Sequence, residues 1–197
     1  MVMSSSLLEA AFAHHVWATT RLIDACLDLS HEQLETSVLG TRGPILDTLR
    51  HLVLNDTFDL FVLSGDRAFD IDDEDMTLAR ARATMERNGA GWAEYLSGSL
   101  DPDEMVHEID RSDGFQRWAP VGFRLAEVLD HGTDHRSQVC TAITSLGVEP
   151  PKIDVFNYGL GAGRIVEKMP NAKGSPGRVV TALRPRRRPT RNRAGRR

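Results

Sequence analysis

Residues 122–147 read GFRLAEVLDHGTDHRSQVCTAITSLG, and this stretch decides the fold class. Its apolar side chains recur at helical spacing and would form a single stripe: Val128, Leu129, Val139, Ala142, Ile143 and Leu146. Gly147 is a typical residue at the end of a helix, and the two prolines at 150 and 151 forbid its continuation. The pattern predicts a long amphipathic helix that buries one face.

Three further helices of similar length are expected before it, over residues 6–29, 44–64 and 77–97. Ser6 and Glu9 can form a capping box at the start of the first helix, and Pro44 suits the first turn of the second. Residues 103–119 alternate around Ser-Asp-Gly, which predicts a hairpin, and residues 153–168 could add one short helix. The sequence therefore predicts an all-α protein, a four-helix bundle with a short β-hairpin before the last long helix.

The charge of the 197-residue chain is strongly uneven. Residues 171–197 hold ten lysines and arginines and no acid, which leaves 14 basic and 28 acidic residues in residues 1–170. We expect a bundle domain over residues 1–170 and a basic, disordered tail over residues 171–197, because the tail has few apolar side chains to offset its ordering entropy. The acidic domain would be repelled by nucleic acid, and only the tail could bind it, nonspecifically.

The composition also predicts a cytoplasmic protein without a membrane segment. The two cysteines, Cys26 and Cys140, rule out a disulfide framework and favour a reducing compartment. No apolar run approaches the roughly 18 residues of a membrane span. The first twenty residues lack the basic segment that opens a secretory signal, so export is not expected.

The candidate site consists of histidines. His131 and His135 lie four residues apart, so both imidazoles can face one point from the buried side of the helix. Two inward histidines are costly unless something satisfies them, and a divalent metal ion would do so. His51, at the edge of the apolar stripe of the second helix, is the first choice as third ligand. The other four histidines are competitors: His14, His15, His31 and His107.

Simpler explanations apply to the same residues. The spacing of His131 and His135 also arises by chance on helix surfaces, and His51 alone could be an ordinary core histidine. Gly132 follows His131, so the glutamate of the H-E-x-x-H metalloprotease motif is absent.

Three stretches make the chain resemble the DinB/YfiT-like family of metal-dependent four-helix bundles. They are FAHHVWATTRL at 12–22, GPILDTLRHL at 43–52 and DHGTDHRSQ at 130–138. The family form of the third stretch is close to N-H-x-T-H-H-R-G-Q. Its ligand histidines match His131 and His135, and the histidine of the second stretch matches His51. The departures are aspartates at 130 and 134 and a serine at 137, none of them in the ligand set.

The resemblance implies a three-histidine site for zinc, or for nickel, iron or manganese, with one coordination position open. Similar proteins include S-transferases that use mycothiol or bacillithiol, as well as hydrolases, and many are homodimers. We therefore expect a thiol S-transferase, with a hydrolase or a non-catalytic metal-binding stress-response protein as alternatives. His15 is a weak candidate for a catalytic or substrate-contacting residue, because in similar proteins its position faces the metal cavity.

Arg136 is a weak candidate for holding an anionic substrate or cofactor, and a salt bridge on the helix surface is the simpler alternative. Asp130 and Asp134 could orient the imidazoles as hydrogen-bond acceptors. Trp17 is expected in the core, and Cys140 is expected to be inert.

Overall fold

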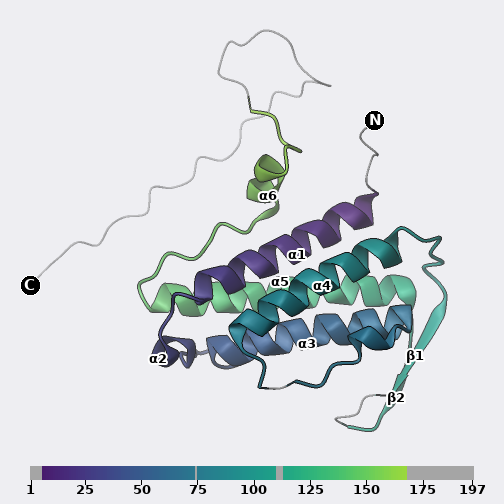
Figure 1. Cartoon of the computed structure of the whole chain (residues 1–197), viewed down its shortest axis with the longest axis horizontal. Helices are drawn as coiled ribbons and strands as arrows, with labels where there is room; N and C mark the ends of the chain where they lie inside the picture. The colour runs from purple at the N-terminus through teal and green to yellow at the C-terminus, as the bar shows by residue number, and fades with distance from the viewer. Residues whose placement is uncertain (1–5, 74, 110–112, 168–197) are drawn as a thin grey trace, which may run out of the picture. The chain divides into compact units, whose positions relative to one another are not determined.

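The structure is a computed structural model that describes residues 6–73, 75–109 and 113–167. Four long helices form the bundle in Figure 1: α1 (Leu7–Cys26), α3 (Ile45–Ser64), α4 (Leu78–Leu96) and α5 (Val121–Ser145). The shorter elements are α2 (His31–Leu34), the 3-10 helix η1 (Arg67–Phe69), the strands β1 (Met105–Ile109) and β2 (Gln116–Pro120), and α6 (Val155–Gly161). The predicted fold class is confirmed, including the hairpin before the last long helix.

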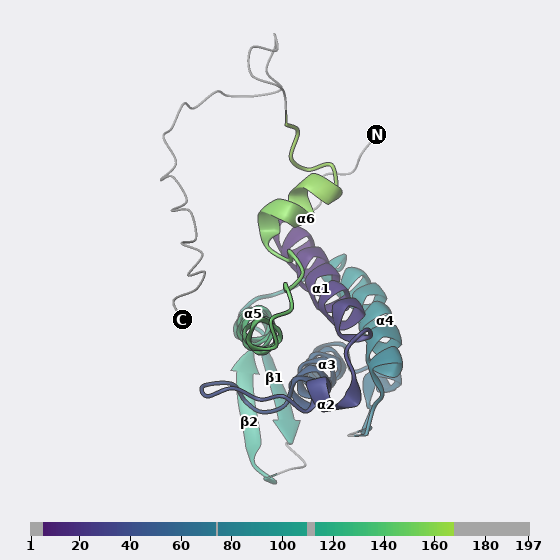
Figure 2. The ribbon, with the colours of Figure 1, turned by 90° about the vertical axis from the view of Figure 1, so that its left-hand side faces the viewer.

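Each long helix contributes one apolar face to a shared core. α1 and α3 both pack against α4 and α5, and Figure 2 shows the four helices around this core. One part of the core contains Leu22, Leu49 and Val139, and the other contains Phe12 and Trp92. Because α1 contributes to both parts, the core extends along the bundle.

The helix ends follow the local chemistry of the sequence. Ser6 caps α1, and its hydroxyl and the Glu9 side chain form the predicted capping box. α5 ends at Ser145, and Gly147 adopts a φ of 76°, a left-handed conformation that favours glycine. These ends confirm the start of the first predicted helix and the stop of the last.

Two glycines lie in the middle of α4, where helix propensity alone predicts a weak point. The helix is continuous because each glycine allows a close approach. A Cβ atom at Gly91 would lie 2.5 Å from Phe69 and 2.6 Å from Leu60. A Cβ atom at Gly89 would lie 2.8 Å from Val16 on α1. Tertiary packing therefore offsets the low propensity.

The hairpin closes one side of the candidate site. β1 and β2 pair antiparallel, with Val106 opposite Ala119 and Glu108 opposite Arg117. β1 contacts α3 and β2 contacts α5, so the hairpin spans the two helices that carry the predicted ligands. Glu108 is buried by this contact.

One compact unit ends at Ile165, and a second begins at Val166. The predicted basic tail, residues 171–197, lies outside the described residues. In the part of the chain that the structure describes, no helix has both the length and the apolar character needed to span a bilayer.

Candidate metal centre

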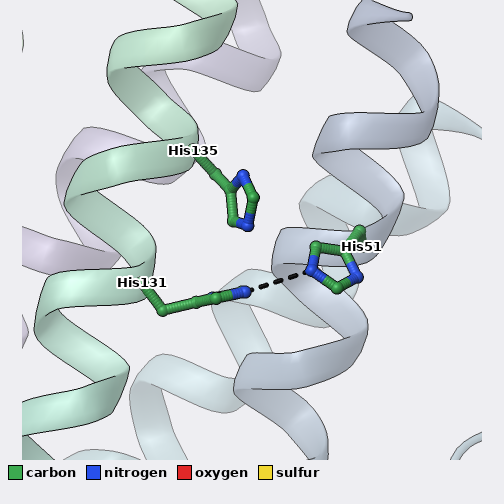
Figure 3. Close-up of side chains that lie close together, drawn as sticks. All are labelled: His51, His131 and His135. Atoms are coloured by element: carbon green, nitrogen blue, oxygen red, sulfur yellow. Dashed lines mark hydrogen bonds between the residues drawn. The ribbon is translucent and has the colours of Figure 1, made fainter. Parts of the chain in front are cut away.

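Three histidines from two adjacent helices point toward one another (Figure 3). His51 comes from α3, and His131 and His135 come from successive turns of α5. Each offers one ring nitrogen, and these three atoms lie within 4.8 Å of one another. Nε2 of His51 lies 3.1 Å from Nε2 of His131. A group with this spacing could hold one divalent metal ion.

Burial keeps these imidazoles neutral. It lowers the pKa of His51 to about 4, with smaller contributions from Arg42 and the other two histidines. The pKa of His131 also falls to about 4, mainly through burial and then through His135. Burial lowers the pKa of His135 as well. Neutral imidazole is the form that ligates a metal, so the electrostatics suit the donor set.

His135 has an unsatisfied polar atom. Its Nδ1 is buried and has no hydrogen-bond partner among the described residues. Buried polar atoms are normally hydrogen-bonded, and leaving one without a partner is costly. The cation would bind on the other side of this ring, where Figure 3 shows the second ring nitrogen of His135 pointing toward His51 and His131.

Asn55 lies one turn after His51 and holds its ring. The Asn55 side-chain nitrogen lies 2.8 Å from His51 Nδ1 and 2.9 Å from the His51 carbonyl oxygen. The same amide nitrogen reaches both the ring and the backbone of His51, so Asn55 fixes the orientation of this ring beside the other two histidines.

A pocket of about 530 Å³ opens beside the histidines, between α3, α5 and the hairpin. Its lining includes His131 and Asn55, so a small molecule in the pocket would reach the metal-binding group. Aromatic side chains line the pocket from all three sides: Phe58 of α3, Trp118 of β2 and Phe123 of α5.

The pocket also contains a buried cluster of charged groups. Arg124 forms an ion pair with Glu108, and its Nη1 lies 3.5 Å from Oδ1 of Asp59. Burial raises the pKa of Asp59 to about 8, although Arg124 opposes that shift. The carboxyl group of Asp59 can therefore hold a proton at neutral pH, within the pocket that reaches His131.

The sequence analysis missed this cluster. Arg124 precedes His131 by seven residues, which places both on the same face of α5, so a signal for Arg124 existed. Glu108 gave no signal, because nothing in the sequence specified that the hairpin would dock against α3 and α5.

His15 and Arg136 lie in a different environment from the histidine cluster. His15 is fully buried, with Nδ1 3.0 Å from Nη1 of Arg136 and Nε2 2.9 Å from Oδ1 of Asp56. Arginine only donates, so Nδ1 accepts and Nε2–H donates to Asp56. Both ring nitrogens of His15 are therefore used inside the protein, which favours a structural role. Arg136 is buried beside His15 rather than placed on the helix surface.

The remaining histidines lie outside the three-histidine group. His14 donates from Nε2 to the Ile153 carbonyl oxygen at 2.9 Å. His31 is exposed on α2, and His107 stacks on Trp118 in the hairpin.

The other residues that the sequence analysis singled out line no part of the pocket beside the histidines. Asp130 and Asp134 are exposed, and Asp134 accepts a hydrogen bond from Gln138 at 2.8 Å. Trp17 and Cys140 are partly buried.

Comparison with known protein families agrees with this geometry. The model of the DinB family matches residues 3–165, which is most of the chain. The chain therefore belongs to the DinB family. No curated protein matches it.

Proposed function

We propose that this member of the DinB family is a metal-dependent enzyme whose ligands are His51, His131 and His135. The observation that carries the proposal is the convergence of three neutral imidazoles beside a pocket large enough for a small substrate. A divalent cation held by three histidines lowers the pKa of a thiol or water in its open position, which supplies a nucleophile at neutral pH. Zinc is the expected metal, with nickel, iron and manganese as alternatives.

Transfer of a low-molecular-weight thiol such as mycothiol or bacillithiol to an electrophile is the reaction we favour. The aromatic walls of the pocket suit an apolar acceptor. Asp59, with its raised pKa, can give a proton to the acceptor and take one from solvent afterwards. Arg124 of α5 lies beside Asp59, and Glu108 of β1 pairs with that arginine.

The decisive experiment incubates metal-loaded protein with a panel of small electrophiles, with and without mycothiol or bacillithiol. Adducts that require both the thiol and the metal support transfer, and they should disappear in His131→Ala. Consumption of the electrophile without thiol would instead show that water is the nucleophile, and the protein would be a hydrolase.

A non-catalytic metal-binding protein of the stress response is the remaining alternative. It gains support if elemental analysis finds metal in the protein while neither arm of the assay shows turnover. The protein should be purified without a metal-affinity tag, because such a tag would bring its own metal.

We further propose a cytoplasmic homodimer, which follows from the resemblance and from the cysteine usage. Light scattering of the purified chain tests the dimer. A mass of one chain at micromolar concentration would reject it.

A further inference from the structure

A second cavity, of about 1030 Å³, lies between α1, α5 and the segment that forms α6. The residues of α5 that line it lie roughly 150° around the helix axis from His131 and His135, at about 100° per residue. The cavity therefore faces away from the histidine cluster. Most of its lining is apolar, including Leu7, Ala11, Leu129, Ile153 and Val155.

Arg136 contributes a buried positive charge to the floor of this cavity. It is only 4% exposed, and no carboxylate of a described residue pairs with it directly. Its Nη1 donates to His15 at 3.0 Å and to Thr19 at 3.1 Å, and its Nη2 donates to Thr133 at 3.1 Å. All three acceptors are uncharged, because Nδ1 of His15 offers a lone pair. A guanidinium keeps its proton in proteins, so Arg136 carries its charge at neutral pH.

Arg136 has donors left for a ligand. A guanidinium has five N–H groups, and three of them are used by the described residues. The carboxylate of Asp56 does not reach the guanidinium directly, because the imidazole of His15 lies between them. A buried cation without a direct counterion is unfavourable, and a bound carboxylate would provide that counterion.

None of the other charged groups of the cavity provides a counterion for Arg136, so an anion can bind there. Asp154 is the acid in the lining, and it is already engaged as the N-cap of α6, where it accepts from the backbone and side chain of Asn157. The other charged or titratable groups of the lining are Arg164, His14, His15, Cys140 and Tyr158, and none of these is an acidic side chain of the carboxylate type. The electrostatic balance of the cavity therefore favours one negative charge.

We propose that this cavity binds a small amphipathic carboxylate, with the apolar body between α1, α5 and α6 and the carboxylate on Arg136. The volume suits a medium-chain fatty acid or an aromatic acid. This site is independent of the metal centre, because it uses the opposite face of α5.

Isothermal titration of the full chain with decanoate and with decanol tests the proposal. The two probes share an apolar body, and only decanoate carries the charge. We expect decanoate to bind at least about tenfold more tightly than decanol, since a hydrogen-bonded charge pair is worth this much. Arg136→Gln should remove that advantage and leave decanol binding unchanged. Arg82→Gln, which changes a partly exposed arginine on α4 outside the cavity, is the matched control and should bind both probes as the native chain does.

Three further variants control for misfolding of Arg136→Gln and for binding of the probes at another site. Arg136→Lys keeps the charge and should retain part of the preference for decanoate. Ala11→Trp should fill the cavity and abolish binding of both probes even if Arg136→Gln fails to fold. His131→Ala should bind decanoate normally, which would exclude the metal centre as its site. Equal affinity for the two probes, normal decanoate binding by Ala11→Trp, or a second copy of the chain covering this face would each overturn the proposal.

Discussion

His135 is the residue on which metal binding depends most directly. It is the most buried of the three histidines, and its Nδ1 has no partner among the described residues. Two ligands rarely hold a divalent ion, so His135→Ala should reduce the metal content from about one per chain to near zero. Elemental analysis of protein purified without a metal-affinity tag measures this loss. His31→Ala and His107→Ala are matched controls outside the cluster, and both should retain the metal. Full metal occupancy in His135→Ala would refute the assignment.

The same histidines predict how the stability of the metal-free protein depends on pH. The pKa of His51 and of His131 is about 4 in the folded state and about 6.5 in the unfolded state. Above pH 6.5 neither state binds these protons, so their contribution is constant. Between pH 6.5 and 4 the unfolded state binds more protons, and the free energy of unfolding should fall as the pH falls.

Urea unfolding at several pH values between 7 and 4 measures this dependence. Asp59 has the opposite effect on the free energy of unfolding. Its pKa of about 8 in the folded state lies above the unfolded value, so its contribution to stability is lost as the pH rises. His131→Gln separates the two, since it removes one histidine and keeps Asp59. The urea midpoint of His131→Gln should change less between pH 6.5 and pH 4 than the urea midpoint of the native chain. An unchanged slope would show that His131 is protonated equally in both states.

At the level of the helices, Asp56 connects the long helices of the bundle through buried hydrogen bonds near the site. This buried carboxylate of α3 accepts hydrogen bonds from His15 of α1 and from Asn88 and Trp92 of α4. Through His15 it also reaches Arg136 of α5. One carboxylate therefore links all four long helices, and it lies five residues after His51.

Removing this carboxylate should weaken the whole bundle. Asp56→Ala would leave the buried donors of His15, Asn88 and Trp92 without this acceptor, so we expect the free energy of unfolding to drop by about 3–5 kcal/mol. Urea unfolding at neutral pH measures the drop. Asp47→Ala, which removes a half-exposed carboxylate on the same helix, should change it by less than about 0.5 kcal/mol. A similar effect of both substitutions would contradict the role assigned to Asp56.

The sequence predicted the helices and the pair on α5 because both depend on spacing along one helix. His131 and His135 share a face of the helix wherever that helix lies in the bundle. His51 was predicted as the third ligand on two other grounds: its position at the edge of an apolar stripe, and the resemblance to the family. The network of Asp56, Asn88 and Trp92 could not be predicted, since it depends on how three helices are rotated and shifted against one another. Helical periodicity indicates which face is buried, and it leaves that relative alignment open.

Close packing was the other feature that periodicity missed. A Cβ atom at Gly132 would lie 2.3 Å from the His15 ring, so this glycine lets the ring pack against α5 beside Arg136. In the sequence, Gly132 only marked the absence of a metalloprotease glutamate. The reason for a glycine at this position is its contact with the His15 side chain, which is more than a hundred residues away in the sequence.

In the whole molecule, α5 separates two chemically different sites. One face carries the histidine cluster against α3, and the opposite face carries Arg136 and the cavity that α1 and α6 help to form. The buried chain of His15, Asp56 and Arg136 lies between them and holds α5 in place. The bundle can therefore support both sites while the hairpin and α6 enclose one each.

Residues 171–197 should be dispensable for this architecture. They hold ten basic residues and no acid, and their apolar side chains show no helical or strand periodicity. Attraction to the acidic domain is screened beyond about 10 Å at 0.1 M salt, so it adds little to folding. A chain that ends at residue 170 should keep its metal and unfold within a few degrees of the full chain in calorimetry. A decrease of more than about 10 °C corresponds to a few kcal/mol in a domain of this size, and it would show that the tail packs as part of the structure.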